Sequence, residues 1–268
     1  MNENVKTKAN RIEIYHDNFQ NYKRYNIPKA QLVIADIPYN IGTDFYASNP
    51  NWYVGGDNKN GESDKAKKAA FNSDFKFNIA EYFHFCSSLL KKEPDKSNGR
   101  GKSSDAPCMI VFCSFEQINT VISYGEKYGF EHYIPLVFCK NYSPQVLKAN
   151  MKIVGATEYA ILLYRNKCPK FNNEGHMIFN WFEWKRDNSK EYPKIHPTQK
   201  PVNVLKKLIG IFTDESDVVI DPCCGSGSTL RACSELRRSC FGFEVDRQCY
   251  LRAKEEMLAD CLTNKEYL

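Results

Sequence analysis

The sequence predicts an α/β fold with a mostly parallel, twisted sheet and helices on both faces. First, short apolar segments alternate with longer segments whose apolar residues recur every three or four positions. Second, the 268 residues are 42% hydrophobic and 26% charged, which is ordinary globular composition. Alternating strands and helices of this kind build a covered parallel sheet, whose ligand sites lie at the carboxyl ends of the strands.

The N-terminal part contains two expected strands, one helix and two polar stretches. Residues 12–15 alternate in polarity, and 31–37 (QLVIADI) form an apolar run typical of a buried strand. Residues 42–64 are rich in Asn, Gly and Asp and predict a long loop. Residues 65–90 have helical periodicity, whereas 91–106 (KKEPDKSNGRGKSSDA) have low complexity and predict an exposed connection.

From position 109 onward, strands and helices alternate regularly. The expected strands are 109–113, 132–140, 158–164, 217–221 and 240–245. The expected helices are 116–128, 202–212, 228–236 and 247–258. Residues 166–194 mix basic and aromatic residues without a regular period. We therefore expect residues 1–268 to form a single domain with inserted loops at 42–64 and 91–106.

Composition excludes several classes of protein. The net charge of +5 suits a polyanionic partner without requiring one. No apolar run approaches the roughly 18 residues that cross a bilayer, and the N-terminus (MNENVKTKANR) lacks the apolar core of a secretory signal. These two observations predict no membrane contact. Eleven cysteines without Cys-x-x-Cys spacing predict reduced thiols in a cytosol, with no disulfide framework and no bound metal.

A glycine-rich loop follows one expected strand and precedes a helix. It reads Asp221-Pro-Cys-Cys-Gly-Ser-Gly-Ser-Thr229, and Glu244 ends the next strand 23 positions after Asp221. This spacing resembles that at which a carboxylate reaches ribose hydroxyls, so a nucleoside ligand is predicted. A phosphate-binding loop would need Gly-Lys-Ser/Thr, and the dinucleotide pattern would need Gly or Ala where Leu230 stands. A simple Gly-Ser turn is the alternative.

A second motif, Asp36-Ile-Pro-Tyr-Asn40, closes the strand at 31–37. The Asp36 carboxylate, the Ile37 carbonyl and the Tyr39 ring together suit a planar ring that bears an exocyclic amino group. Two acceptors on its N–H bonds favour a pyramidal nitrogen whose lone pair can attack, and stacking on Tyr39 would hold the ring. The alternative is a strand end followed by a Pro-Tyr turn.

A third motif, His196-Pro-Thr-Gln-Lys-Pro201, leads into the helix at 202–212. Pro201 suits the start of a helix because its φ is fixed and it has no N–H. Lys200 beside a helix start could meet a small carboxylate. Taken alone, the motif is a polar loop.

Together these motifs resemble the β-type amino-group DNA methyltransferases that use S-adenosylmethionine and modify adenine N6 or cytosine N4. In that family an Asp-Pro-Pro-Tyr segment comes first, and His-Pro-Thr-Gln-Lys-Pro and the cofactor loop follow. The chain keeps this order, and residues 14–17 (IYHD) resemble the family's segment before the catalytic strand. The resemblance implies a Rossmann-like methyltransferase fold with circularly permuted motif order. Ile37 and Cys223 depart from the family's Pro and Phe.

The resemblance also implies roles for individual residues. Catalytic roles on the target base fall to Asp36, Ile37, Pro38 and Tyr39. S-adenosylmethionine binding falls to Asp17, Thr198, Lys200, Asp221, Cys223, Gly225, Gly227 and Glu244, with Thr198 and Lys200 near the methionine end. His196 could brace the loop.

The implied activity is methyl transfer to N6 of an adenine turned out of double-stranded DNA. Asp at position 36 favours adenine, because cytosine members usually carry Ser there. Residues 166–194 are the expected target-recognition segment of the catalytic domain, with phosphate contacts from Lys167, Lys170, Lys185 and Arg186, unless they form a solvated face around a local aromatic core. The loop after Asn40 could close over the site or simply be a surface loop.

Several alternatives remain open at this stage. A cytosine-N4 enzyme on the same scaffold is the first. A methyltransferase for RNA or protein amides is the second, although these usually carry Asn-Pro-Pro-Tyr after the cofactor loop. A DNA-binding subunit with a decayed active site is the third, and rests on Ile37 and Cys223. A homodimer sharing the duplex and a bacterial or phage-infected cytoplasm are further expectations.

Overall fold

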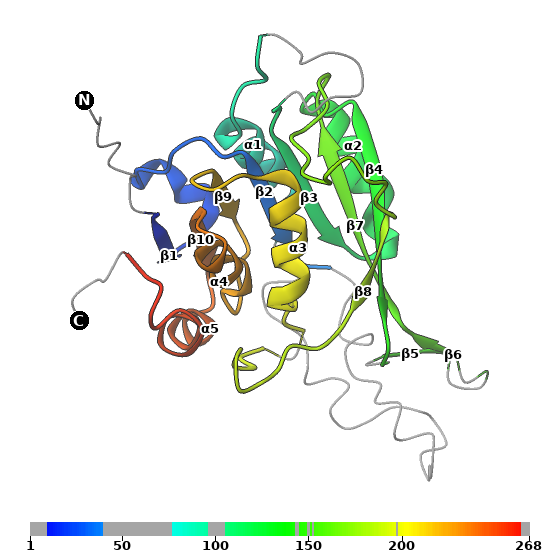
Figure 1. The fold of residues 1–268 in the computed structure, drawn as a ribbon, viewed down its shortest axis with the longest axis vertical. Helices are drawn as coiled ribbons and strands as arrows, with labels where there is room; N and C mark the ends of the chain where they lie inside the picture. The colour runs from blue at the N-terminus through cyan, green and yellow to red at the C-terminus, as the bar shows by residue number, and fades with distance from the viewer. Residues whose placement is uncertain are drawn as a thin grey trace.

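The computed structural model describes residues 10–39, 77–95, 105–142, 145–148, 151, 153–196 and 198–263. Its centre is an eight-stranded sheet in the order β1-β10-β9-β2-β3-β7-β4-β8 (Figure 1). The strands are β1 (Ile12–His16), β2 (Leu32–Asp36), β3 (Cys108–Cys113), β4 (His132–Lys140), β7 (Thr157–Tyr164), β8 (Trp181–Trp184), β9 (Val218–Asp221) and β10 (Ser239–Glu244). Only β7 runs antiparallel to its neighbours, which confirms a mostly parallel sheet.

Helices cover both faces of the sheet, as the alternating pattern predicts. The helices are α1 (Ile79–Leu89), α2 (Ile118–Lys127), α3 (Val202–Phe212), α4 (Ser228–Glu235) and α5 (Arg247–Arg252). Shorter turns are the 3₁₀ helices η1 (Phe19–Arg24) and η6 (Phe115–Gln117), and a π-helical turn η8 (Ala253–Met257) that extends α5. One apolar layer joins α1 and α2 to the sheet, and the other joins α3, α4 and α5 to the opposite face.

Strand β2 shows why the central strands are continuous apolar runs. Leu32 and Ile34 enter the layer under α3 and α4, whereas Val33 and Ala35 enter the layer under α1, and each is at most 1% exposed. A strand that is covered on both faces needs apolar residues at every position. The seven predicted strands accordingly match observed strands to within one residue at either end.

The structure corrects the sequence-based expectations at several elements. Of the helix expected at 65–90, residues 65–76 lie outside the described residues; the observed helix α1 begins at Ile79, where the Asn78 side chain accepts from the amides of Ala80 and Glu81. Residues 166–194 are not wholly irregular, because β8 adds an edge strand beside β4. Neither η1 nor the small hairpin of β5 (Gln145–Lys148) and β6 (Ile153–Gly155) is evident from the sequence.

Two sequence-based expectations concern residues outside the described part. The loop expected at 42–64 lies there entirely, and of 91–106 only residues 91–95 and 105–106 are described. Among the described helices, none combines the length and apolar character needed to cross a bilayer.

The order of the strands places a change of direction between β2 and β9. From β2 the chain proceeds through α1 to β3 on one side, and from β9 it proceeds through α4 to β10 on the other. The sheet therefore grows in opposite directions from this pair, which is the topological switch point where α/β sheets bind ligands.

Gly242 of β10 is required by packing. A Cβ at this position would lie 2.7 Å from Leu230 Cδ1 and 3.0 Å from Cys224 Sγ. We expect Gly242→Ala to lower the free energy of unfolding by about 1–3 kcal/mol through overpacking, measured by urea denaturation. Gly210→Ala is the control, because its Cβ meets open space in α3 and should raise stability by about 0.5–1 kcal/mol. Equal stability of the two variants would contradict this account.

Candidate active site

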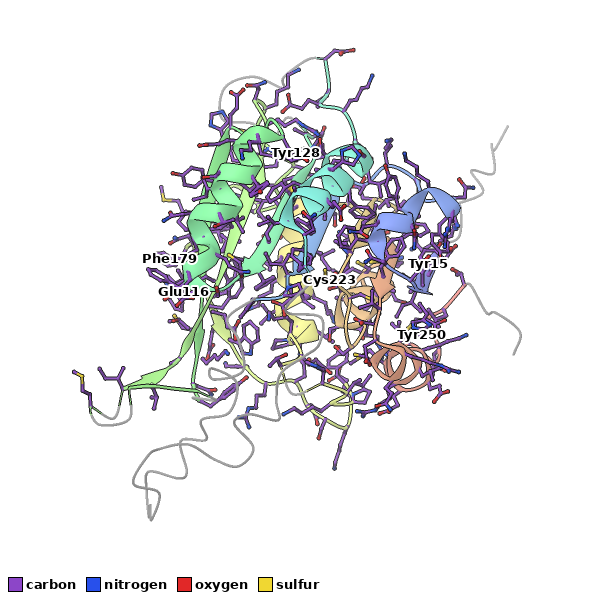
Figure 2. The ribbon with its side chains drawn as sticks, turned by 180° about the vertical axis from the view of Figure 1, so that it is seen from behind. Tyr15, Glu116, Tyr128, Phe179, Cys223 and Tyr250 are labelled. Carbon is purple, nitrogen blue, oxygen red and sulfur yellow. The ribbon has the colours of Figure 1, made fainter. Side chains whose placement is uncertain are left out.

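The segment that begins at Asp36 and the glycine-rich loop that begins at Asp221 meet at the switch point. Parallel pairing of Leu32 with Val219 and Val33 with Ile220 places the ends of β2 and β9 at the same edge of the sheet. These ends are Asp36 and Asp221. Burial raises the pKa of Asp221 and of Cys223, and the charge of Asp36 adds to both rises, in agreement with the closeness of these strand ends. Figure 2 places Cys223 near the centre of the molecule.

Asp36 has one oxygen engaged and one available. Its Oδ2 accepts from Lys200 Nζ at 2.5 Å. Its Oδ1 is buried and has no hydrogen-bond partner among the described residues. Burial raises the pKa of this carboxyl and Glu158 adds to the rise, while Lys200 opposes it. A buried acceptor without a partner is costly unless a ligand completes it.

Residues 37–39, which follow Asp36, are held in place by neighbouring elements. Ile37 is 1% exposed, and its amide donates to Phe112 O at 3.1 Å, extending the ladder between β2 and β3. The family's Pro has no N–H and could not make this bond, so this departure from the motif does not loosen the strand end. Gln117 donates to the Pro38 carbonyl at 2.9 Å, and Tyr39 OH donates to Glu158 Oε2 at 2.7 Å.

Lys200 lies against the Asp36 carboxylate. It is 8% exposed, and its ammonium is 5.5–5.7 Å from the ring centres of Phe112, Tyr39 and Trp184. Cations at such distances are attracted to aromatic faces. The sequence places this lysine beside a helix start, where it could meet a small carboxylate; in the structure the carboxylate that it contacts is that of Asp36.

Sequence reasoning missed Glu158, Lys140 and Trp184. Glu158 accepts from Lys140 Nζ and lies 3.7 Å from Lys200 Nζ. Burial raises the pKa of Glu158, but Lys200 and Lys140 outweigh it and lower the pKa to about 2. No motif spacing links these residues, because they meet only once β7 inserts antiparallel between β3 and β4. An acidic residue at the start of an expected strand is the one available signal.

The glycine loop turns tightly at two positions with positive φ. Gly225 has φ 49° and Gly227 has φ 77°, a region that favours glycine. A Cβ on Gly227 would also approach Leu258 Cδ1 at 3.0 Å, whereas Gly225 has open space. The loop is anchored by Cys224 N, which donates to Phe243 O at 2.9 Å.

Three carboxylates, those of Asp36, Asp221 and Glu244, end the neighbouring strands β2, β9 and β10. Asp221 accepts from Cys223 N at 3.0 Å, and Glu244 accepts from Asp246 N at 2.7 Å. Burial raises the pKa of Asp221 to about 7 and raises the pKa of Glu244. With Asp36, they form a site that favours a cationic ligand, because a positive charge relieves their desolvation and mutual repulsion. No cluster of metal-ligating side chains occurs in the described ranges.

The remaining predicted cofactor residues have partners within the chain. Asp17 accepts from Asn18 N at 2.7 Å, Asn21 Nδ2 at 2.6 Å and Tyr25 OH at 2.8 Å. Although burial raises its pKa, these hydrogen bonds lower it overall. Thr198 Oγ1 lies 2.9 Å from His196 Nδ1, which fits a bracing role for His196.

The four predicted phosphate contacts fall into two groups. Lys170 pairs with Asp214 at 2.7 Å and with Asp217 at 3.1 Å. Both acids precede strand β9, so this pair lies at the edge of the sheet opposite Asp36. Lys167 contacts residues 93–94. Lys185 and Arg186 instead follow Trp184, which reaches the site. The Lys185 side chain is 70% exposed, and Arg186 lies 3.8 Å from the Tyr142 ring centre.

Comparison with known proteins identifies the family. The model of the N6/N4 DNA methylase family matches residues 30–255. The chain belongs to this family. It is 25% identical over 250 residues to the DNA adenine methyltransferase YhdJ of Escherichia coli K12, covering 88% of the chain and 78% of YhdJ. It is 24% identical over 263 residues to type II methyltransferase M2.DpnII of Streptococcus pneumoniae, covering 96% and 93%.

Solved structures share the methyltransferase fold. The M1.HpyAVI–SAM complex has a TM-score of 0.60 at 22% identity, covering 91% of the chain and 97% of that protein. The cytosine-N4-specific PvuII DNA methyltransferase has a TM-score of 0.63 at 14% identity, covering 97% and 89%. Other matches are partial: the chain spans 61% of the length of YubD of Escherichia coli K12 and 24% of M.HindIII of Haemophilus influenzae.

Asp221 predicts a pH dependence of stability. A buried acid whose pKa is raised to about 7 destabilises the fold once it ionises, so its contribution to stability falls as pH rises from its ordinary pKa through about 7. Asp221→Asn should therefore gain stability relative to wild type, on the order of 3 kcal/mol, between about pH 4 and about pH 8. Urea unfolding at both pH values measures this.

Asp217→Asn is the control for that experiment. Burial raises the pKa of Asp217, but hydrogen bonds from Asp214 N and Lys91 outweigh it and lower the pKa overall. Its ionised form therefore stabilises the fold, and the variant should not gain on wild type as pH rises. A constant difference between Asp221→Asn and wild type would contradict the assignment.

Proposed function

We propose that this DNA methylase transfers a methyl group from S-adenosylmethionine to N6 of adenine in double-stranded DNA. The observation that carries the proposal is the unpartnered Asp36 Oδ1, buried beside Tyr39 at the switch point where the glycine loop begins. Membership of the N6/N4 family supports amino-group chemistry on DNA.

The residues around the glycine loop suit S-adenosylmethionine. This cofactor is cationic at its sulfonium and amino groups, and Asp221, Glu244 and Asp36 have raised pKa values that such charges would relieve. Gly225 and Gly227 allow the close backbone approach that a nucleoside needs. When bound, the cofactor supplies an activated methyl group.

The chain's own groups act on the target amine. Asp36 Oδ1 accepts one N–H and the Ile37 carbonyl accepts the other, which concentrates the lone pair on nitrogen for direct in-line attack. Tyr39 stacks on the base and limits its motion. Asp36 is positioned to take the proton that the amine loses, and its raised pKa suits this role.

Adenine is the target that the site favours. Asp at position 36 supports it, and YhdJ, which aligns over most of the chain, is named a DNA adenine methyltransferase. The cytosine-N4 specificity of the PvuII enzyme makes cytosine the competing target. Nucleoside analysis of methylated DNA separates N6-methyladenine from N4-methylcytosine directly.

DNA is expected to lie across the carboxyl edge of the sheet. The target base must leave the duplex to reach Asp36, whose side chain is 30% exposed. Lys185 and Arg186 are the predicted cations best placed to hold phosphates there, since Trp184 links them to the site. We also propose that a second copy of the chain binds the same duplex, and that the protein acts in the cytoplasm of a bacterial or phage-infected cell.

Asp36→Ala should lower methyl transfer at least about 100-fold, because the amine loses its acceptor. Transfer of labelled methyl groups to unmethylated DNA measures the rate, and calorimetry with S-adenosylmethionine shows whether the cofactor loop is intact. Asp214→Ala is a matched control, since Asp214 also pairs with a lysine but at the opposite edge. Wild-type rates for Asp36→Ala would refute the catalytic assignment.

Lys200→Met should move the acidic limb of kcat/KM to higher pH. Lys200 lowers the pKa of Asp36, so its removal raises that pKa and delays ionisation, by on the order of one pH unit. The pH profile of methyl transfer measures the shift. An unchanged limb in an active variant would show that Asp36 does not control it.

A further inference from the structure

We infer that Glu158 is a positioning residue of the methyltransferase site, which tethers Tyr39 and shares the Lys200 ammonium with Asp36. The inference rests on the proposed function and deepens it. None of the three sequence motifs contains Glu158, which lies near the start of β7.

Topology brings this carboxylate to the catalytic edge. Because β7 runs antiparallel between β3 and β4, its beginning meets the carboxyl ends of these strands. Glu158 pairs in register with Phe138, and Tyr159 pairs with Cys113, the last residue of β3. An acid here reaches the same space as Asp36 without belonging to the strand that carries it.

Each oxygen of Glu158 has a defined partner. Oε1 accepts from Lys140, whose side chain is 8% exposed, and Oε2 accepts from Tyr39 OH at 2.7 Å. The Tyr39 hydroxyl stays protonated, since burial raises its pKa well above the usual value. The phenol therefore donates to Glu158 while its oxygen lies 3.5 Å from Lys200 Nζ, and these contacts fix the position of the hydroxyl end of the ring.

The same carboxylate balances charge at the reaction centre. Lys200 Nζ lies 2.5 Å from Asp36 Oδ2 and 3.7 Å from Glu158 Oε2. Two lysines and two carboxylates thus alternate in space, in the order Lys140, Glu158, Lys200 and Asp36. The charge of Glu158 raises the pKa of Asp36, and that of Lys200 lowers it. Burial raises the pKa of Tyr39, Cys113, Asp221 and Cys223, which face Asp36, and the charge of Asp36 adds to each rise.

A purely structural ion pair is the competing explanation, and substitutions separate the two. Glu158→Gln keeps the shape but removes the charge. We expect kcat to fall about 10- to 100-fold through misplacement of Tyr39, with unchanged affinity for S-adenosylmethionine. We also expect the acidic limb of kcat/KM to move to lower pH, because the influence that raised the Asp36 pKa is gone.

Tyr39→Phe tests the tether without touching the charge. It keeps the ring and should lower kcat about as much as Glu158→Gln does, but the acidic limb should not move to lower pH, because Tyr39 lowers the pKa of Asp36 whereas Glu158 raises it. The double variant should be no slower than the slower single variant, since both substitutions act on the same hydrogen bond: Phe removes its donor, and Gln replaces its charged acceptor by a weaker neutral one. Additive losses would overturn the tether.

Glu235→Gln is the matched control. Glu235 in α4 also accepts from one tyrosine hydroxyl and two cations: Tyr192 at 2.9 Å, Lys206 at 2.7 Å and Arg231 at 2.7 Å. It should lose stability without a shift in the pH profile. If Glu158→Gln also loses stability without a shift in the pH profile, Glu158 has only a structural role.

The design separates this inference from the proposed function. A wild-type protein that transfers no methyl group to DNA refutes the proposed function alone. NMR titration of the labelled Asp36 carboxyl then tests Glu158 without turnover: a lower Asp36 pKa in Glu158→Gln supports the inference, and an unchanged pKa overturns it. Should that variant not fold because Lys140 loses its partner, Lys140→Met/Glu158→Gln removes both charges and is subject to the same readouts.

Discussion

The parallel pairing of β2 with β9 is the constraint on which the site depends. It places Asp36 and Asp221 at one edge, where the chain departs from the two strands in opposite directions. The pairing is secured by two apolar layers, one on each face of the sheet, rather than by contacts within the site. The polar chemistry at the edge therefore rests on an apolar framework that does not take part in it.

The site concentrates charge in a place with little water. Asp36, Glu158, Lys140 and Lys200 sum to zero, and each has an oppositely charged neighbour. Buried ion pairs contribute little to stability compared with apolar packing, but breaking one by removal of a single partner is costly. Their presence at this edge is consistent with a functional demand: a carboxylate must stay available to a substrate while its neighbours remain paired.

Family membership and fold leave the target base undecided, since relatives and structural neighbours include both adenine and cytosine enzymes. We expect a few side chains at the carboxyl edge of the sheet to decide between adenine and cytosine. At Ile37 the proposed chemistry belongs to the backbone carbonyl, and the isoleucine side chain packs in the apolar layer. Its amide even adds a backbone hydrogen bond that proline could not make.

Periodicity and motif order were enough to determine the strands, most helices, the mostly parallel sheet and the glycine loop, because these depend on neighbours close in the chain. Tertiary structure alone decided that Lys200 contacts Asp36, that Lys170 turns to Asp214 and Asp217, and that Glu158 joins the site. Short edge strand β8 and the antiparallel insertion of β7 were likewise invisible, since pairing partners far apart in sequence leave no local pattern. Charged side chains at strand ends find their partners only after the strand order is set.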